Sequence, residues 1–384
     1  MAGCHRATDA YPNVKFRLRA LRADRRYTVR SVCHAAGYEI RYDSWVGRAV
    51  SAVGTGIRLL VRSFLVCAAI VRHRDLALSY VPYPAVPVLW ILSFVPRALR
   101  PRRIVADAFI SLYDTIVFDR GLVGRGSPLA GALRRIEARA LGQADLVIVD
   151  TVQNAVHYST ILDLPRARFL PLPLSTGFER IRPSVYDPGR TARLRIVYVG
   201  TMVPLHGVDV LCDALGQLDR ALPIDVELYG DGQCAQRVAA LVESLGGGGP
   251  EGGLSVRWQR GWCPPRDLIR ILGDADLCIG ILGTSAKAMR VWPYKNYLYM
   301  ACGRALVTAR TPASRALLGG RADLSPFLEV DPGDATGLAA LFERLVLDKP
   351  SLLRVARDAR SLFDEALSAT AIADRLDAAL RGTA

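Results

Sequence analysis

The chain carries, at residues 197–211, the stretch VYVGTMVPLHGVDVL. A short apolar run ends at Gly200, and apolar residues with helical spacing follow Gly207. This order predicts a buried strand, a tight turn and a helix, with backbone N–H groups and a positive dipole end facing the crevice beyond the strand. Such a crevice favours a phosphate group. Because any Rossmann-like unit has a similar turn, the stretch alone indicates the fold class and not the ligand.

The same alternation of strands and helices continues through the second half of the chain. Residues 175–193 are poor in apolar side chains and predict a linker. The predicted strands after it are 195–199, 224–229, 255–259, 277–281 and 305–308, and the predicted helices are 207–218, 234–245, 265–272, 295–302, 334–347 and 351–367. Nearly continuous apolar strands are typical of a parallel sheet that is covered on both faces.

The first half shows a less regular form of this alternation. It predicts helices at 13–23, 46–71, 85–94 and 128–141 and strands at 27–33, 76–81, 104–105 and 146–149. A chain of 384 residues is long enough for two domains. We therefore predict an α/β protein with two Rossmann-like, doubly wound domains facing a cleft. The expected domains are 1–180 and 181–365, with a C-terminal helix at 366–384 that packs back on the first.

Two further motifs of the second half follow predicted strands. In LYGDG, Gly230 and Gly232 allow close approach of the backbone, although a plain turn explains them equally well. In the stretch 280–303, Lys287 lies in a loop and Lys295 near the start of a helix. Basic side chains at the carboxyl edge of a sheet suit a diphosphate. The alternative for Lys295 is an exposed helix lysine without a ligand.

Taken in order, VYVGTMVPLHGVDVL, LYGDG, ADLCIGI and KAMRVWPYKNYLYMACGRALVT resemble the C-terminal half of GT-B glycosyltransferases, most closely the retaining family 4 group. The likeness covers residues 195–347 well. In the first half it is looser and rests on RDLALSYVPYPAVPVLWILSF and ADLVIVDT. The resemblance implies a GT-B fold whose second domain holds a nucleotide-diphosphate sugar without any metal or cofactor. The first domain would present the acceptor, and transfer would retain the anomeric configuration.

The resemblance also implies the donor-binding residues, which are Gly200, Thr201, His206, Gly207, Gly230, Gly232, Trp262, Lys287 and Lys295. The chain departs from the family pattern at several positions. Thr201 stands where the family usually has Arg, and the paired glutamates of the family fall at Arg290 and Leu298. We hypothesise that Lys287 replaces the missing basic residue.

A dense polar group, DAFISLYDTIVFDR, follows the predicted strand at 104–105. Because loops at the carboxyl ends of strands carry the sites of α/β sheets, Asp107 or Asp114 could orient the acceptor hydroxyl or the donor sugar. With Lys287 they form the predicted catalytic set. The equally weighted alternative is that these carboxylates cap a helix and pair with neighbouring arginines. The family often has a His shortly after the first Asp, where this chain has Ala108 and Phe109.

The formal net charge of +14 lies entirely in the first half. Lys and Arg outnumber Asp and Glu by 27 to 13 in residues 1–183, whereas residues 184–384 hold 23 of each. No zinc-finger, RNA-binding or helix-turn-helix pattern is present, so we expect no nucleic acid and favour an anionic membrane surface or a phosphate-bearing substrate. A basic half without a special role is the alternative.

One uncharged segment, 76–96, is long enough to span a bilayer. Its prolines Pro82, Pro84 and Pro87 disfavour a spanning helix, and a strand, a turn and a short helix are the simpler prediction. We expect peripheral attachment through this region and the apolar, basic run 57–72.

The eight cysteines form no C-x-x-C pair and have no His at metal-ligand spacing, which predicts reduced thiols in a cytoplasmic protein and no metal site. The predicted function is a glycosyltransferase at the inner face of the plasma membrane. Its acceptor would be a lipid-linked glycan of an envelope or exopolysaccharide. The alternatives are a GT-B scaffold without catalysis, favoured by the missing glutamates, and another GT-B enzyme such as a sugar-nucleotide epimerase, which the scarcity of His disfavours.

Overall fold

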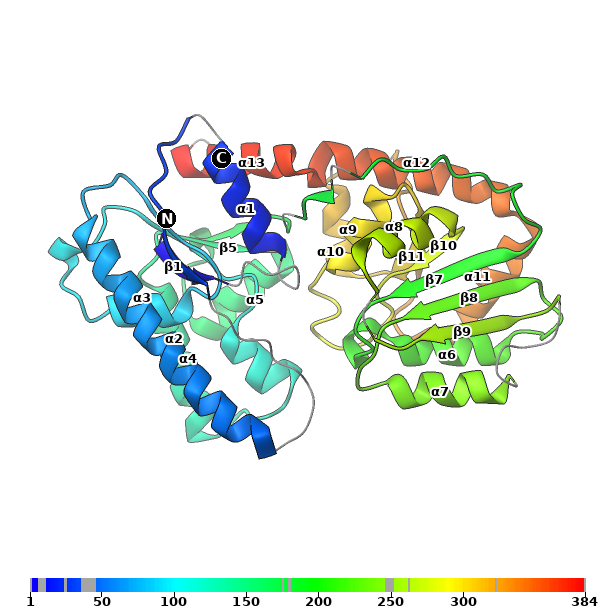
Figure 1. Ribbon diagram of the computed structural model, residues 1–384, viewed down its shortest axis with the longest axis horizontal. Coiled ribbons are helices and arrows are strands. Elements are labelled where there is room, and N and C mark those ends of the chain that lie inside the picture. The colour runs from blue at the N-terminus through cyan, green and yellow to red at the C-terminus, as the bar shows by residue number, and fades with distance from the viewer. Residues whose placement is uncertain are drawn as a thin grey trace. The chain divides into compact units, whose positions relative to one another are not determined.

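The computed structural model describes residues 2–5, 12–23, 26–35, 46–174, 176–178, 181–245, 252–261, 263–321 and 323–382. The chain divides into two compact units (Figure 1). Unit 1 comprises Met1–Ser175 and Ile372–Ala384, and unit 2 is Thr176–Ala371. The chain therefore leaves unit 1, builds the whole of unit 2 and returns to unit 1 for its last helix.

Unit 1 is built on parallel strands. Strands β3 (Ser79–Val81), β4 (Ile104–Asp107), β5 (Leu146–Val149) and β6 (Phe169–Pro171) form one sheet in that order, and β1 (Ala2–His5) pairs with β2 (Val32–Ala35). The helices are α1 (Pro12–Ala23), α2 (Val46–Arg72), α3 (Val86–Leu92), α4 (Pro128–Leu141), α5 (Val152–Leu162) and α13 (Ala369–Arg381), with a π-helical turn η2 (Asp114–Asp119). Pro171 is tolerated because β6 is an edge strand of its sheet.

Alternate residues of the β4 strand point into two different cores. Ile104 and Ala106 belong to the cluster that α2, α3, α4 and α5 cover. Val105 belongs to a second cluster, which is completed by residues of α1 and α13 that include Leu18 and Leu376. Since successive side chains of a strand point to opposite faces, helices cover both faces of this sheet, as in a doubly wound fold.

Unit 2 contains one sheet of six parallel strands with the order β12-β11-β10-β7-β8-β9. The strands are β7 (Leu194–Val199), β8 (Ile224–Tyr229), β9 (Ser255–Gln259), β10 (Leu277–Ile279), β11 (Ala305–Ala309) and β12 (Leu328–Val330). The helices are α6 (Val208–Gln217), α7 (Ala235–Ser244), α8 (Pro265–Asp274), α9 (Tyr294–Ala301), α10 (Pro312–Leu318), α11 (Ala335–Leu347) and α12 (Leu352–Leu362). The short turns η5 (Pro204–His206), η6 (Lys349–Ser351) and η7 (Phe363–Leu367) connect them. This strand order is that of the Rossmann fold.

Most of the predicted elements are confirmed. The strands at 146–149, 224–229 and 255–259 and the helix at 128–141 have the predicted bounds. Among the described elements, β1, α5, β6, α10 and β12 were not predicted, and β6 and β12 are three-residue strands too short to show a period. Within the described part of the chain, no helix is both long and apolar enough to cross a membrane.

The strand predicted at 27–33 is wrong in its first half, because the observed strand begins only at Val32. Tyr27 belongs to no strand or helix. Its ring packs against the cluster formed by α1 and α13, and its hydroxyl donates to the carboxylate of Asp377 at 2.5 Å. Long-range packing against the last helix therefore replaces the sheet contact that the apolar pattern predicted.

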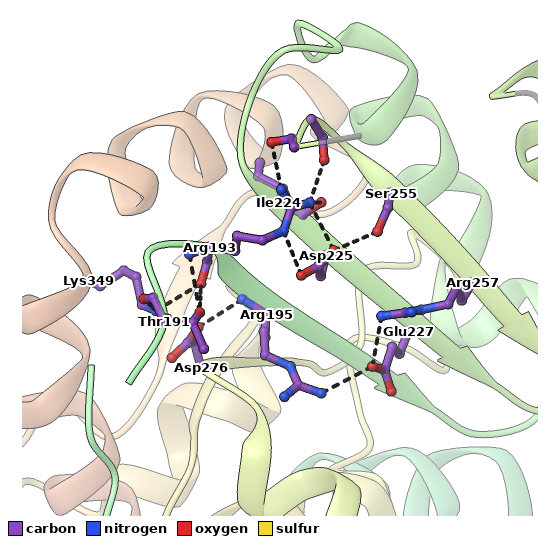
Figure 2. A network of polar contacts seen from close by, with 12 residues as sticks. Thr191, Arg193, Arg195, Ile224, Asp225, Glu227, Ser255, Arg257, Asp276 and Lys349 are labelled. Carbon is purple, nitrogen blue, oxygen red and sulfur yellow. Dashed lines mark hydrogen bonds and ion pairs between the residues drawn. The ribbon is translucent and has the colours of Figure 1, made fainter. Parts of the chain in front are cut away.

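Charged side chains of unit 2 form a network at the amino ends of its strands (Figure 2). The guanidinium of Arg193 donates to both oxygens of Asp225 at 2.8 and 2.9 Å, and Ser255 donates to the same carboxylate at 2.6 Å. Arg193 directly precedes β7, Asp225 is the second residue of β8, and Ser255 is the first residue of β9. The network therefore ties neighbouring strands together at the edge opposite to their carboxyl ends.

The most deeply buried pair of this network joins Asp276 to Lys349 (Figure 2). Their side chains are 5% and 7% exposed, and Nζ lies 3.0 Å from Oδ2. Nζ also donates to the carbonyls of Thr191 and Arg193 at 2.9 Å each, and the backbone N–H of Arg195 donates to Asp276 at 2.8 Å. One ammonium thus fixes the chain before β7, the start of β10 and the turn after α11.

Candidate functional site

The strand order of unit 2 reverses between β7 and β10. From β7 the chain moves outward to β8 and β9, then returns to β10 and moves outward in the other direction to β11 and β12. In open α/β sheets, ligands bind beyond the carboxyl ends of the strands at such a switch point. Gly200 directly follows β7, and Gly280 directly follows β10. These two positions define where the site is expected.

Three of the predicted donor-binding residues meet at the end of β7. Gly200 has a φ of 145°, and a Cβ there would lie 3.6 Å from Nδ1 of His206 and 3.6 Å from Cδ of Lys295. This conformation favours glycine. The structure therefore brings the end of β7, the turn η5 and the first turn of α9 to one place, although nearly one hundred residues separate Gly200 from Lys295 in the sequence.

Lys295 is buried and lacks a polar partner. The residue is 7% exposed, and among the described residues Nζ has no hydrogen-bond partner. Nζ lies 4.0 Å from the ring centroid of Tyr198, a cation–π contact. Burial lowers the pKa of the Lys295 ammonium well below its usual value. The alternative of an exposed helix lysine is therefore wrong, and the ammonium is available to an anion at the switch point.

Asn296 adds a second buried polar group that the sequence analysis missed. The residue is fully buried, and within the described chain neither Oδ1 nor Nδ2 has a hydrogen-bond partner. Its Oδ1 would lie 3.0 Å from a Cβ on Gly280, at the end of β10. Buried amides are almost always hydrogen-bonded, so unpaired groups here indicate a ligand or ordered water. An asparagine on a predicted helix was no signal by itself, because the burial of residues 295–301 is known only from the structure.

The imidazole of His206 is held in one tautomer. Its Nδ1 lies 2.7 Å from the carbonyl oxygen of Thr201, which only accepts, so Nδ1 carries the proton and donates. Burial, together with the nearby charge of Lys295, lowers the pKa of His206 to about 3. The ring is therefore neutral at neutral pH, with Nε2 as an acceptor. Thr201 itself is exposed at the carboxyl end of β7.

Gly207, Gly230 and Gly232 are required by close contacts between loops. A Cβ on Gly207 would lie 2.4 Å from the backbone nitrogen of Gly283, and one on Gly230 would lie 2.0 Å from the carbonyl oxygen of Gly200. A Cβ on Gly232 would lie 2.6 Å from the carbonyl oxygen of Met202. All three have positive φ. These glycines therefore fix the loops after β7, β8 and β10 against one another.

We expect Gly230→Ala to destabilise unit 2 by more than about 2 kcal/mol, because its φ is 139° and the new methyl group would overlap the Gly200 carbonyl. Urea unfolding measures this. Gly216→Ala is the matched control, since Gly216 lies in α6 with open space around its Cβ position. That control should leave stability unchanged or raise it by up to about 1 kcal/mol. Equal effects of the two substitutions would contradict the close contact.

The remaining predicted donor-site residues lie in the loop after β10 or outside the described residues. Lys287 is half-buried in the turn that follows β10, where the backbone N–H of Arg290 donates to its carbonyl at 3.0 Å. Arg290 also donates from Nε to the carbonyl of Ala286 at 3.1 Å. Leu298, at the second glutamate position of the family, is buried. Trp262 lies outside the described residues.

In unit 1, the structure makes Asp107 part of a buried ion pair. Asp107 ends β4 and is fully buried. Its Oδ2 accepts from Nη1 of Arg17 at 2.5 Å and from the hydroxyl of Tyr80 at 3.0 Å. Arg17 is itself 1% exposed and belongs to α1. This geometry favours the alternative weighed above, in which the carboxylate pairs with a neighbouring arginine.

Asp114 is also fully buried, at the start of η2, but it holds a partly exposed imidazole. Its Oδ1 lies 2.8 Å from Nε2 of His157, which comes from α5 and whose side chain is 21% exposed. Nε2 therefore donates and Nδ1 is left as the acceptor in the neutral ring. The side chain of Asp114 is 1% exposed, so His157 is the member of this pair that reaches the surface. Sequence reasoning missed His157 because it lies 43 residues from Asp114 in the chain.

A third carboxylate, Glu137, lies behind this pair and fixes the loop between β4 and η2. It accepts from the hydroxyl of Ser111 and from the backbone N–H groups of Leu112 and Tyr113, at 3.0, 3.0 and 2.6 Å. Burial raises the pKa of Glu137 in spite of these hydrogen bonds. Among the residues that the structure describes, no group of three or more His, Cys, Asp or Glu side chains is arranged to hold a metal ion.

Comparison with known proteins supports the fold and the resemblance. Residues 193–348 match the family model described as Glycosyl transferases group 1. The crystal structure of Anabaena HepE in complex with UDP aligns over 99% of this chain and 98% of that chain, with 13% identity and a TM-score of 0.67. A search of the curated proteins finds no match.

Two further solved structures have the same fold. A glycosyltransferase from Rickettsia africae aligns over 99% of this chain and 97% of that chain, with 10% identity and a TM-score of 0.64. The sucrose-phosphate synthase from Thermosynechococcus elongatus aligns over 91% and 82%, with 15% identity and a TM-score of 0.63. The predicted GT-B fold with two Rossmann-like domains is confirmed.

Proposed function

We propose, from the premise that unit 2 resembles group 1 glycosyl transferases and that the chain has the GT-B fold, that this protein is a glycosyltransferase. It moves a sugar from a nucleotide-diphosphate donor to a glycan acceptor, with retention of configuration and without a metal or other cofactor. The observation that carries the proposal is the Lys295 ammonium, buried at the switch point without a polar partner. A buried cation in that place calls for an anion, and a diphosphate supplies one.

In this proposal the donor diphosphate lies beyond the ends of β7 and β10. Lys295 neutralises the negative charge that grows on the departing diphosphate, and its buried surroundings strengthen that interaction. The amide of Asn296 can donate to a phosphate or sugar oxygen. Lys287, in the turn after β10, supplies a second positive charge in place of the basic residue expected near Thr201. The neutral His206 orients the end of β7 through its hydrogen bond to the Thr201 carbonyl.

The residues of unit 1 take separate roles in the proposal. Asp107 stabilises the fold of unit 1, since its buried carboxylate accepts hydrogen bonds from Arg17 and Tyr80. Asp114 is assigned as a positioning residue that orients His157 toward an acceptor hydroxyl. We further propose that the acceptor is a lipid-linked glycan of an envelope or exopolysaccharide and that the protein works at an anionic membrane surface. The basic charge excess of residues 1–183 supports this location.

The proposal is tested by thermal and urea unfolding with a panel of UDP-, GDP- and TDP-sugars. HepE has been crystallised with UDP and with UDP-glucose, so UDP-sugars come first. A donor at one hundred times its Kd should stabilise the protein by about 2.7 kcal/mol, and slow hydrolysis of the same donor should follow. If no nucleotide sugar stabilises the protein or is consumed, the GT-B scaffold without catalysis is the better reading. The scaffold alternative is supported by Arg290 and Leu298, which stand in place of the paired glutamates of the family.

A further inference from the structure

One face of α2 carries a continuous stripe of exposed apolar side chains. Figure 1 shows α2 as the long blue helix of unit 1. The stripe consists of Ile57, Leu60, Val61, Phe64 and Leu65, which are 58%, 50%, 56%, 63% and 51% exposed. Their spacing of three and four residues places them on one side of the helix. Exposed apolar residues scattered singly are normal, but a contiguous stripe of this kind marks an interaction surface.

The opposite face of the same helix is fixed in the core of unit 1. Ser63, Val66, Cys67 and Ile70 are buried, and the last three belong to the cluster that also contains residues of α3 and the central strands. The stripe therefore cannot be covered by a rotation of α2 without exposing this buried face. The helix has 27 residues, and the stripe runs over nine of them, about 12 Å along the helix axis.

The charges around the stripe have a single sign. The sequence of α2 contains no Asp or Glu and four arginines, at positions 48, 58, 62 and 72. Arg58 and Arg72 are exposed. On a helical wheel Arg58 borders the stripe, and Arg72 lies on the same side of the helix at its last residue, seven residues beyond Leu65. An apolar stripe with cationic borders is the pattern of a helix that lies in the interface of an anionic bilayer.

Exposed apolar side chains are also unevenly divided between the units. Among the described large hydrophobic residues that are exposed, twelve lie in unit 1 and four in unit 2. Unit 1 also contains nearly all of the net positive charge of the chain. Exposed apolar side chains and positive charge therefore occur in the same unit. Among the described residues, α2 carries both on one face.

We infer that α2 docks unit 1 on an anionic phospholipid surface, with the apolar stripe in the interface and its arginines at the headgroups. The inference rests on the proposed function, because docking on a bilayer serves an enzyme whose acceptor is lipid-linked. A second copy of the chain is a poorer occupant, since two α2 helices facing one another would bring like charges together. Electrostatic attraction to anionic lipid adds instead to the burial of the stripe.

The test is flotation of the full chain with phosphatidylcholine vesicles, with and without phosphatidylglycerol. The wild type should bind the anionic vesicles, and added salt should weaken that binding. The variant Leu60→Glu with Phe64→Glu should reduce binding by about tenfold or more, because two apolar groups are lost and two repelling charges are gained. Leu347→Glu is the matched control, since Leu347 is 89% exposed and lies in unit 2. It should bind as the wild type does.

The α2 variant should keep the circular dichroism of the wild type and its stabilisation by a nucleotide sugar, because both substituted residues are exposed. Donor binding in solution needs no membrane, so it separates a failure of this inference from a failure of the proposed function. Equal flotation of the α2 variant and the wild type would overturn the inference. A wild-type dimer that Phe64→Glu dissociates, with no vesicle binding, would overturn it too and assign the stripe to contacts between copies of the chain.

Discussion

Lys295→Met is expected to lower kcat/KM by about 10²–10³-fold while leaving the ligand-free protein as stable as the wild type or more stable. The substitution removes a buried ammonium without a polar partner and replaces it with an apolar side chain of similar length. The free protein gains because a buried amino group without a hydrogen-bond partner is gone, and such a group costs free energy in either protonation state. Donor binding loses its buried positive charge. Steady-state kinetics and urea unfolding on the same preparations measure the two effects.

Protonation of Lys295 gives this prediction a second readout. Burial lowers the pKa of the ammonium in the free protein, and a bound diphosphate would raise it, so donor binding should take up a proton. Donor affinity should therefore fall as the pH rises from the lowered pKa of the free protein toward the higher pKa of the complex. The stability of the ligand-free protein should instead rise with pH over the same range, because the unfolded chain binds the proton more tightly than the folded protein does. Calorimetry in buffers of different ionisation enthalpy detects the proton uptake.

Both pH trends should disappear in Lys295→Met. Lys295→Arg is the control that keeps the charge but changes its shape, and it should bind the donor better than the methionine variant does. If Lys295→Met bound the donor as the wild type does, with the same pH dependence, then Lys295 would have no part in the donor site. The proposal would then lose the observation that carries it.

Asp276→Asn is expected to destabilise unit 2 by about 3–5 kcal/mol, the usual cost of removing one partner from a buried ion pair. The substitution would leave the Lys349 ammonium, which is 7% exposed, without a charged partner. Lys349 would keep its hydrogen bonds to the carbonyls of Thr191 and Arg193, but these do not neutralise it. Urea unfolding followed by circular dichroism measures the change.

An exposed ion pair of the same unit provides the comparison. Asp213 pairs with Arg237 on the surface, where the two side chains are 46% and 57% exposed. Asp213→Asn should therefore cost less than about 1 kcal/mol, because water screens such pairs. Donor binding by folded Asp276→Asn should match that of the wild type, since Asp276 lies at the amino ends of the strands, away from the switch point. A cost for Asp276→Asn as small as that for Asp213→Asn would show that the buried pair contributes little to stability.

The fold could be predicted from the sequence mainly where elements are long or strongly apolar. The strand that ends at Val199, its turn at Gly200 and the helix after Gly207 follow from apolar spacing and glycine alone. The strands β6 and β12 do not, because three residues show no period. Tyr27 was misread because its partner, Asp377, lies 350 residues away. The apolar pattern of a segment does not show which distant element will cover it.

The candidate site could be predicted only in part, for a related reason. Gly200 and Lys295 were identified, but their contact depends on the sheet order and on the turn that leads into α9. Asn296 and His157 were missed because an asparagine or histidine on a helix is unremarkable until its surroundings are known. Asp107 was placed in the predicted catalytic set because it ends a strand, and only the structure shows that one of its carboxylate oxygens already accepts from Arg17 and Tyr80. Burial separates these cases, and a sequence pattern does not report burial at single residues.

The return of the chain to unit 1 has a consequence for folding during synthesis. Ile372, Leu376 and Leu380 of α13 complete the second core of unit 1, and Arg103 donates to the α13 carbonyls of Ala379 and Leu380. A ribosome makes the strands of unit 1 first and these residues only after all of unit 2. One face of the first sheet is therefore only partly covered, by α1, while the second unit is made, and a pause in translation within unit 2 prolongs the time in which that face can aggregate.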